Sequence, residues 1–193
     1  MDFIELLSAR HSKLMVLRIN FHYSKEFNNS FERENEFKDK YFQAAKDLKK
    51  FLNSVRKRKL SKHMVGYAWK LEYASLAGFH YHLLFFFDGS EVWDGGNRAK
   101  MIGEYWQNII TQGRGRYFNG NDKEYVNNNE DCGIVGMIDF NDPYLKEGLK
   151  KTVNYLTMPD YAYYAKIVAP DNGDTFGKGG LAKKTTGINI EKA

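Results

Sequence analysis

The sequence has little cysteine and no long apolar run, and these two absences narrow the possibilities first. The 193 residues include one cysteine, Cys132, which excludes an internal disulfide and a cysteine-rich zinc site. The stretch from Met1 to Arg10 lacks a basic segment followed by an apolar one, and no stretch approaches the length of a membrane span. We therefore expect a soluble protein of the cytoplasm, a reducing compartment, with no membrane partner.

The sequence does contain a modest excess of positive charge and enough apolar material for one core. Lys and Arg total 29 against 24 Asp and Glu, which gives a net charge of +5 and favours a polyanionic partner. Hydrophobic residues make up 42% of the chain and aromatic residues 16%, and the length does not suit two domains. We expect one domain over residues 1–170 and a loop or tail rich in glycine and lysine over residues 171–193.

The spacing of apolar residues predicts an order of strands and helices along the chain. The expected elements are a strand at Lys13–Tyr23, an amphipathic helix from Ser30 to about Lys57, a hairpin of Val65–Tyr73 and Phe79–Phe87, a helix from a cap at Asn97 to about Thr111, a strand at Ile134–Phe140, and a helix from Pro143 to about Thr157 after a cap at Asn141 or Asp142. Residues 112–133 are expected to be loop. This order predicts an α+β fold in which helices pack on an antiparallel sheet, with a ferredoxin-like split βαβ arrangement as the natural candidate.

The second strand of the hairpin carries the most informative motif. His80 and His82 must share one face, because side chains alternate along a strand. Glu72 lies eight residues before His80, so a turn near Leu76 places it opposite or diagonal to the histidines on the same face. Three such ligands leave positions open for water and a phosphate oxygen, as a catalytic metal requires.

We therefore predict a divalent metal, Mg or Mn, held by Glu72, His80 and His82, although zinc, cobalt and nickel also accept these ligands. The alternative interpretation is that both histidines are core residues bonded to the backbone. A buried carboxylate on the same face argues against it, because such a group requires a cation of some kind.

A tyrosine on the helix after Pro143 is the candidate nucleophile. Tyr155 lies one turn after Lys151, so the two side chains share a face of the helix. A nearby ammonium group and a metal-polarised phosphate favour attack by a phenol that is otherwise a poor nucleophile at neutral pH. The product would be a 5′-phosphotyrosine and a free 3′-hydroxyl. Tyr163, which begins a Tyr-x-x-Lys pattern ending at Lys166, is the alternative nucleophile, and Tyr155 is preferred.

Two basic segments are candidates for contact with nucleic acid. One ends the long helix, where a solvated helix terminus is the simpler interpretation and phosphate contact the functional one; it comprises Arg56, Lys57, Arg58 and Lys59. The other lies in the glycine-rich loop and combines cations with stacking surfaces; it comprises Arg114, Arg116, Tyr117 and Phe118. We expect the second segment to be the better candidate for single-stranded DNA.

Four motifs together carry a resemblance to a known family: Leu17–His22, Glu72 with His80-Tyr81-His82, Asn154–Thr157, and Asp174–Gly179. In this order, over residues 14–180, the chain resembles the replication-initiation proteins of filamentous (inovirus-type) phages and related prophage genes, which are HUH-superfamily single-strand nickases. The sequence departs from the family pattern at Asn20, where aspartate is common, and at Met158, where the motif Tyr-x-x-Lys has lysine. Lys151 or Lys166 is the candidate substitute for that lysine.

The resemblance implies a ferredoxin-like HUH endonuclease fold, a divalent metal, and a nucleophilic tyrosine on a helix. It also implies rolling-circle initiation, in which a single-stranded DNA origin, with or without a hairpin, is nicked and rejoined in the cytoplasm of a bacterial host cell. Participation of a host replication helicase is left open.

Two other functions fit the same residues. A nucleic-acid-binding module with a ferredoxin-like sheet and no catalysis would explain the charge and the aromatic residues, but it would not need Glu72, His80 and His82 on one face. A metal-dependent hydrolase that uses activated water would need them, but it would form no covalent adduct with DNA.

Overall fold

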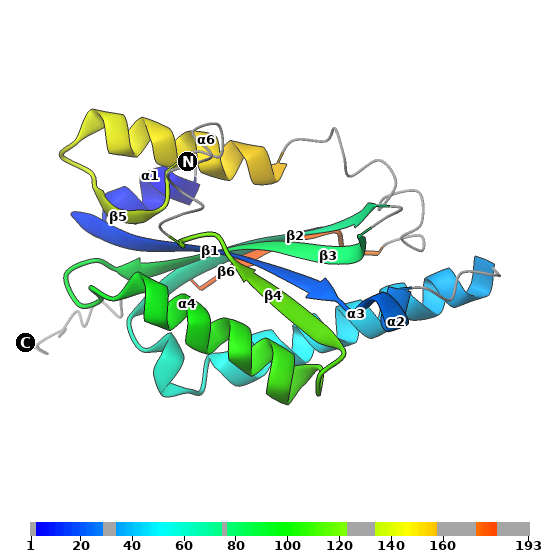
Figure 1. Cartoon of the computed structure of the whole chain (residues 1–193). Coiled ribbons are helices and arrows are strands. Elements are labelled where there is room, and N and C mark those ends of the chain that lie inside the picture. The colour runs from blue at the N-terminus through cyan, green and yellow to red at the C-terminus, as the bar shows by residue number, and fades with distance from the viewer. Residues whose placement is uncertain (1–2, 29–33, 75–76, 123–133, 158–172, 181–193) are drawn as a thin grey trace, which may run out of the picture.

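An antiparallel sheet of six strands lies at the centre of the computed structural model, which describes residues 3–28, 34–74, 77–122, 134–157 and 173–180 (Figure 1). The strands are β1 (Lys13–Tyr23), β2 (Met64–Ala74), β3 (Gly78–Asp88), β4 (Gly115–Asn119), β5 (Gly136–Asp139) and β6 (Phe176–Gly179). Their order across the sheet is β4-β1-β3-β2-β6, and β5 pairs with the first residues of β1. The long strands β1, β2 and β3 are therefore central, and the short β4, β5 and β6 lie outside them.

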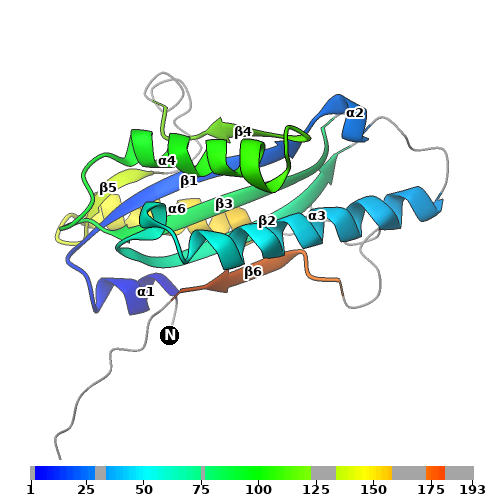
Figure 2. The same cartoon turned by 90° about the horizontal axis from the view of Figure 1, so that it is seen from below.

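Helices cover both faces of this sheet. They are α1 (Phe3–Ser8), α2 (Lys25–Asn28), α3 (Glu34–Val55), α4 (Gly95–Glu104) with a π-helical turn at Tyr105–Ile110, and α6 (Pro143–Thr157), together with a short 3-10 turn at Lys59–Ser61. Helices α1 and α6 lie on one face, and α3 and α4 lie on the other (Figures 1 and 2). No helix within the described ranges combines the length and the hydrophobicity needed to cross a bilayer.

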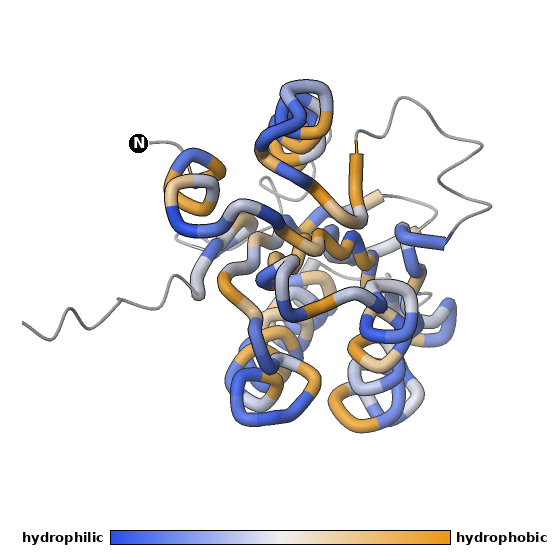
Figure 3. Tube along the Cα trace, turned by 90° about the vertical axis from the view of Figure 1, so that its left-hand side faces the viewer, coloured by the Kyte–Doolittle hydropathy of each residue, from blue (hydrophilic) through white to orange (hydrophobic). Residues whose placement is uncertain are grey.

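Two apolar clusters result, because alternate residues of each strand point to opposite faces. The larger cluster lies under α3 and α4, where the ring of Phe21 stacks on Trp106 at 4.4 Å and packs edge-on against Phe51 at 5.0 Å. The smaller cluster lies under α1 and α6 and includes Leu14 and Leu149. Figure 3 shows the helices in cross-section above and below the sheet, and each helix carries both apolar and polar residues. Amphipathic helices of this kind bury one stripe on the sheet.

The predicted α+β fold is confirmed, and several element bounds agree closely. The first strand has the predicted bounds, the predicted hairpin is β2 and β3, and the predicted helix from Pro143 is α6. The Asp142 carboxylate caps α6 by accepting hydrogen bonds from the backbone N–H groups of Tyr144 and Leu145.

Three local expectations were wrong. Strand β4 lies inside the segment expected to be loop, and β6 lies inside the segment expected to be loop or tail. Both strands are short and gain their order by pairing with long neighbours, which local patterning does not reveal. The third concerns α4, whose cap is Asp94, three residues before the expected cap at Asn97, because the Asp94 side chain accepts the hydrogen bond from the Asn97 N–H at 3.0 Å.

Candidate metal centre

The hairpin register places the three predicted ligands on one face of the sheet. Glu72 lies directly opposite His80, and Lys70 lies opposite His82. The Oε2 atom of Glu72 is 3.1 Å from Nε2 of His82 and 3.5 Å from Nε2 of His80. The candidate ligand atoms all lie within 4.8 Å of one another, and the side chains of Glu72, His80 and His82 are at most 13% exposed. These three residues therefore form a group that could hold a metal ion, and we call them the triad.

Each histidine of the triad is oriented through its other ring nitrogen. The Nδ1–H group of His80 donates to the carbonyl oxygen of Gly78 at 3.0 Å. The Nδ1 atom of His82 lies 3.1 Å from Oδ1 of Asn20, an atom that can only accept a hydrogen bond. Both Nδ1 atoms therefore carry a proton, and both Nε2 atoms face Glu72. Histidine ligands in metal sites are held in this way, with the nitrogen remote from the metal donating to a carbonyl or carboxylate.

Asn20 has a place in the site that sequence reasoning did not find. In the sequence, Asn20 stands where the family pattern commonly has aspartate. It belongs to β1, which is well separated from the hairpin along the chain. The structure pairs it directly with His82 across neighbouring strands. An amide oxygen can accept the Nδ1–H bond as a carboxylate would, but without adding negative charge. The signal in the sequence was the alternation of β1, which places Asn20 on the same face as Arg18 and His22.

Lys70 is a second residue that the sequence did not single out. Its Nζ atom is 2.7 Å from Oε1 of Glu72, and its side chain is only 8% exposed. One carboxylate oxygen of Glu72 thus faces an ammonium group while the other faces the two histidines. Burial raises the pKa of Glu72, but the hydrogen bonds from His80, His82 and Lys70 outweigh it and hold this pKa well below its ordinary value. The carboxylate is therefore ionised at neutral pH.

His22 lies beside the triad on β1, opposite His80. The two imidazole rings stack with their centroids 5.5 Å apart and their planes 9° from parallel. Burial, together with the charges of His80 and His82, lowers the pKa of His22 to about 4. A neutral imidazole thus adjoins the triad.

Helix α6 runs over the face of the sheet that carries the triad. Figure 1 shows it extending from the end near β5 toward the end where β2 and β3 meet. Its residue Leu156 belongs to the same apolar cluster as Ala68 and Leu84. Ala68 and Leu84 lie two residues along their strands from Lys70 and His82, so the last turn of α6 approaches the triad region.

The predicted nucleophile Tyr155 belongs to this last turn of α6, and its side chain lies outside the described part of the structure. Lys151, one turn earlier, is exposed. The alternative nucleophile Tyr163 and the residues Met158 and Lys166 also lie outside the described residues.

One protein family matches most of the chain. The family described as the YagK/YfjJ C-terminal domain matches residues 1–168, a stretch that contains the triad and Tyr155. The chain belongs to this family. It is a prophage-associated family, in agreement with the resemblance to prophage genes seen in the sequence. No curated protein and no solved structure matches the chain.

The first predicted DNA-binding cluster does not lie near the triad. It follows α3, which packs on the opposite face of the sheet. Arg56 donates a hydrogen bond to the hydroxyl oxygen of Tyr67, and its guanidinium lies over the Tyr67 ring. The guanidinium of Arg58 lies 4.5 Å from the centroid of the Tyr105 ring, and the neighbouring Lys57 and Lys59 are exposed. A contact of this cluster with DNA would be remote from the triad.

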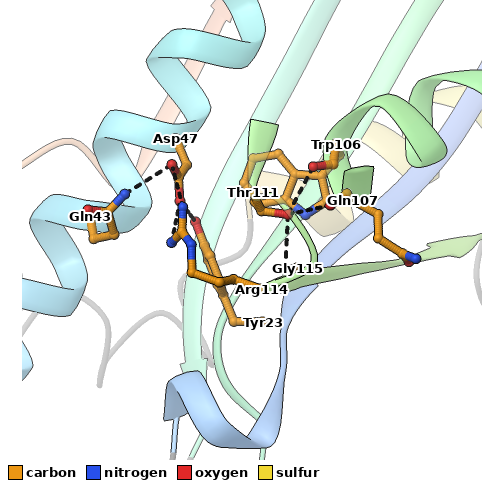
Figure 4. Close-up of polar contacts among 8 residues, drawn as sticks. All are labelled: Tyr23, Gln43, Asp47, Trp106, Gln107, Thr111, Arg114 and Gly115. Carbon is orange, nitrogen blue, oxygen red and sulfur yellow. Dashed lines mark hydrogen bonds and ion pairs between the residues drawn. The ribbon is translucent and has the colours of Figure 1, made fainter. Parts of the chain in front are cut away.

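The second predicted cluster is divided between the two faces. Arg114 donates to both carboxylate oxygens of buried Asp47, at 3.2 and 3.3 Å, and Tyr23 donates to the same carboxylate (Figure 4). Tyr117 packs beside Gly103 of α4, on the face away from the triad. Of the four predicted residues, Arg116 lies on the triad face, opposite His22. The neighbouring Phe118 lies there too, opposite Asn20.

Proposed function

We propose that this protein is a metal-dependent single-strand DNA endonuclease of the HUH type, which nicks and rejoins DNA through Tyr155 and thereby initiates rolling-circle replication. The observation that carries the proposal is the geometry of the triad. The Nε2 atoms of His80 and His82 converge on the Glu72 carboxylate, while their Nδ1 atoms hydrogen-bond to the Gly78 carbonyl and the Asn20 side chain. Helix α6, with Tyr155 near its end, covers the same face of the sheet. Membership of a prophage-associated family agrees with a role in replication of a mobile element.

The spacing of the triad atoms supports a divalent metal. Two ligand atoms that are each about 2.1 Å from one ion, at octahedral or tetrahedral angles, lie about 3.0–3.4 Å apart. The observed separations from Glu72 Oε2 are 3.1 Å to His82 and 3.5 Å to His80. Two imidazoles and one carboxylate accept manganese, and also zinc, cobalt and nickel, while magnesium prefers oxygen ligands. Among the ions first expected, manganese therefore fits this donor set better than magnesium.

The proposed reaction assigns a separate task to each residue. Glu72, His80 and His82 would hold the ion, which supplies Lewis-acid polarisation of a phosphoryl oxygen. The phenolic oxygen of Tyr155 attacks the phosphorus atom, and the P–O bond to the 3′ oxygen breaks. The phenol loses its proton, and the departing 3′ oxygen takes one up, so a 5′-phosphotyrosine and a 3′-hydroxyl result. Rejoining is the reverse, with the 3′-hydroxyl attacking the phosphotyrosine.

Two lysines are candidates to supply the positive charge that Met158 lacks. Lys151 lies one turn before Tyr155 on α6 and is exposed, so it could approach a phosphate bound over the sheet. Lys70 is buried beside the triad and already neutralises one oxygen of Glu72. We propose that Lys151 assists the nucleophile, whereas Lys70 positions Glu72.

Covalent trapping of DNA tests the proposal. Single-stranded DNA of random sequence, labelled at its 3′ end, is incubated with the protein and Mn²⁺ and then run on a denaturing gel. The 5′-phosphotyrosine holds the 3′-labelled fragment, so the label should migrate with the protein. Tyr155→Phe removes only the hydroxyl and should abolish the adduct. Tyr144→Phe, on the same helix and 75% exposed at its other end, is the matched control and should retain it.

The other outcomes separate the competing functions. Free cleaved fragments without an adduct would indicate a hydrolase that uses activated water. DNA binding with no cleavage in the presence of any divalent metal tested would indicate a non-catalytic module. Loss of the adduct in Tyr163→Phe but not in Tyr155→Phe would move the nucleophile to the later segment. Chelation of the metal should abolish the adduct if the triad acts as proposed.

A further inference from the structure

One row of residues crosses the triad face from edge to edge of the sheet. Successive strand pairs place these residues directly opposite one another, in the order Phe118 of β4, Asn20 of β1, His82 of β3, Lys70 of β2 and Phe176 of β6. Directly opposed residues of antiparallel strands share a face, so all five side chains lie on the triad side. The row has polar groups of the metal centre in its middle and an aromatic ring at each end.

Both aromatic residues are partly exposed. Phe118 is 37% exposed and Phe176 is 41% exposed, although large apolar side chains are normally buried. Four strand-to-strand steps separate them, and at about 4.8 Å a step the two positions are roughly 19 Å apart. At this distance the two rings cannot contact each other. Each ring therefore offers a separate aromatic surface, one on either side of His82.

A cation accompanies each ring on the same face. Arg116 lies two residues before Phe118 on β4, and Lys178 lies two residues after Phe176 on β6, and both are exposed. The Arg116 guanidinium donates to the carbonyl oxygens of Gly113 and Gly115, which fixes it at this edge of the sheet. An exposed aromatic residue with an exposed cation on the same face of the sheet matches the two parts of a nucleotide, the base and the phosphate.

We propose that Phe118 and Phe176 are stacking platforms for two bases of one DNA strand, which crosses the sheet perpendicular to the β-strands and passes over the triad. This inference rests on the proposed function only for the identity of the ligand. The bases of a duplex are stacked on each other, whereas those of a single strand can stack on protein rings. Arg116 and Lys178 contact the phosphates next to the stacked bases. A phosphate between the two platforms then lies at the metal centre.

The arrangement has a consequence for specificity. Every base has an aromatic face, so stacking binds a strand with little regard to its sequence. The two platforms would therefore fix the path of the strand over the triad rather than choose the origin. They also require a strand long enough to reach from one edge of the sheet to the other.

Equilibrium binding without metal tests the platforms independently of catalysis. Fluorescence anisotropy is measured for a labelled oligothymidylate of about ten nucleotides, a length within the usual site size of sheet-based single-strand binders. The buffer contains EDTA, and all proteins carry Tyr155→Phe. Phe118→Ala and Phe176→Ala should each weaken binding roughly five- to 150-fold, as loss of one base stack does elsewhere. Phe42→Ala is the matched control, because Phe42 is 56% exposed on α3, on the opposite face.

Two further comparisons identify stacking as the cause. Phe118→Trp should restore binding, whereas Phe118→Leu, which keeps apolar bulk, should not. A dinucleotide, whose stacked bases lie about 3.4 Å apart, cannot reach both platforms. The double variant Phe118→Ala/Phe176→Ala should therefore lose far more affinity for the longer strand than for the dinucleotide. Folding of each variant is checked by thermal unfolding.

The outcomes distinguish this inference from the proposed function. If Phe118→Ala and Phe176→Ala bind the long strand no worse than Phe42→Ala, the platforms do not exist, whether or not the protein nicks DNA. If both variants weaken binding but the wild-type protein forms no adduct, the strand path stands and the nicking proposal fails. Two other results would show that the substitutions disturb phosphate contacts instead, and either would overturn the stacking assignment. In one, the variants lose as much affinity for duplex DNA as for single-stranded DNA; in the other, their binding depends less steeply on salt than that of the wild type.

Discussion

Replacement of Asn20 by alanine should weaken metal binding without touching a metal ligand. The Oδ1 atom of Asn20 accepts the Nδ1–H bond of His82 at 3.1 Å, and the His82 side chain is only 13% exposed. Water has limited access to replace the lost acceptor, so the ring would be free to rotate or to carry its proton on Nε2. Loss of such an orienting contact typically lowers metal affinity 10- to 100-fold, or about 1.4–2.7 kcal/mol.

Isothermal titration of Mn²⁺ or Co²⁺ into each variant measures this effect directly. Asn20→Asp keeps an acceptor and adds negative charge, so it should bind the ion at least as tightly as the wild type. Asn53→Ala, at an exposed position of α3 on the opposite face, is the matched control. An unchanged dissociation constant in Asn20→Ala, or weaker binding by Asn20→Asp than by Asn20→Ala, would refute the assignment of Asn20 as the residue that orients His82.

Three more substitutions test other contacts of the site and the fold. Gly78→Ala should destabilise the protein, because Gly78 has a φ of +65° and a Cβ there would lie 2.1 Å from the Asn28 side chain. It should also impair metal binding, because the Gly78 carbonyl orients His80. Lys70→Met should lower metal affinity in titrations, because Oε1 of Glu72 loses its buried partner at 2.7 Å and the carboxylate can turn away from the histidines. Asp88→Asn should lower the free energy of unfolding by about 1 kcal/mol at pH 7, and urea titrations should show this difference shrinking at pH 3.

The sign of the pH effect follows from the pKa of Asp88. Burial raises this pKa, but hydrogen bonds from the Ser90 backbone and from His11 outweigh it, so the folded protein has a pKa below the ordinary value. A depressed carboxyl pKa stabilises the fold above the unfolded pKa of about 3.9, and this stability is lost as the pH falls through the folded value. Asp88→Asn removes the ionised group, so wild type and variant should converge in acid.

Matched controls accompany these three substitutions. Gly136→Ala introduces alanine at a φ of +93° with open space around the Cβ, so it should reproduce backbone strain without loss of metal binding. Lys178→Met removes an exposed cation on the triad face and should leave metal affinity unchanged. Glu147→Gln removes an exposed carboxylate of α6 and should show no pH-dependent change in stability. A control that behaves like its test variant would mean that the contact in question is not the cause.

The central strands and the triad could be predicted from the sequence because both depend on local patterns. Alternation along β1 and the spacing of Glu72 from His80 determine which side chains share a face, and the hairpin register is confirmed. The start of α6 was also predictable, since Asp142 and Pro143 are standard residues for those positions. These features need no knowledge of distant parts of the chain.

The rest of the site depends on pairing between distant segments. Asn20 and His82 are separated by 62 residues and meet only because β1 lies beside β3. Strands β4 and β6 have weak local patterns, with glycine at several positions, and join the sheet through β1 and β2. Without β6 the sequence gives no indication that Phe176 lies in one row with His82. The sequence likewise does not show that Tyr117 packs beside α4 while Arg116 and Phe118 lie on the triad face.

Identification of the residue that becomes linked to DNA tests the proposed nickase most directly. The protein is incubated with single-stranded DNA and Mn²⁺, digested with nuclease and protease, and analysed by mass spectrometry. We predict a peptide in which Tyr155 carries a nucleotide 5′-phosphate, formed only with metal and absent from His82→Ala. A linked peptide that contains Tyr163 or Tyr164 instead, or cleaved DNA with no linked peptide, would contradict the proposal that Tyr155 is the nucleophile over the triad.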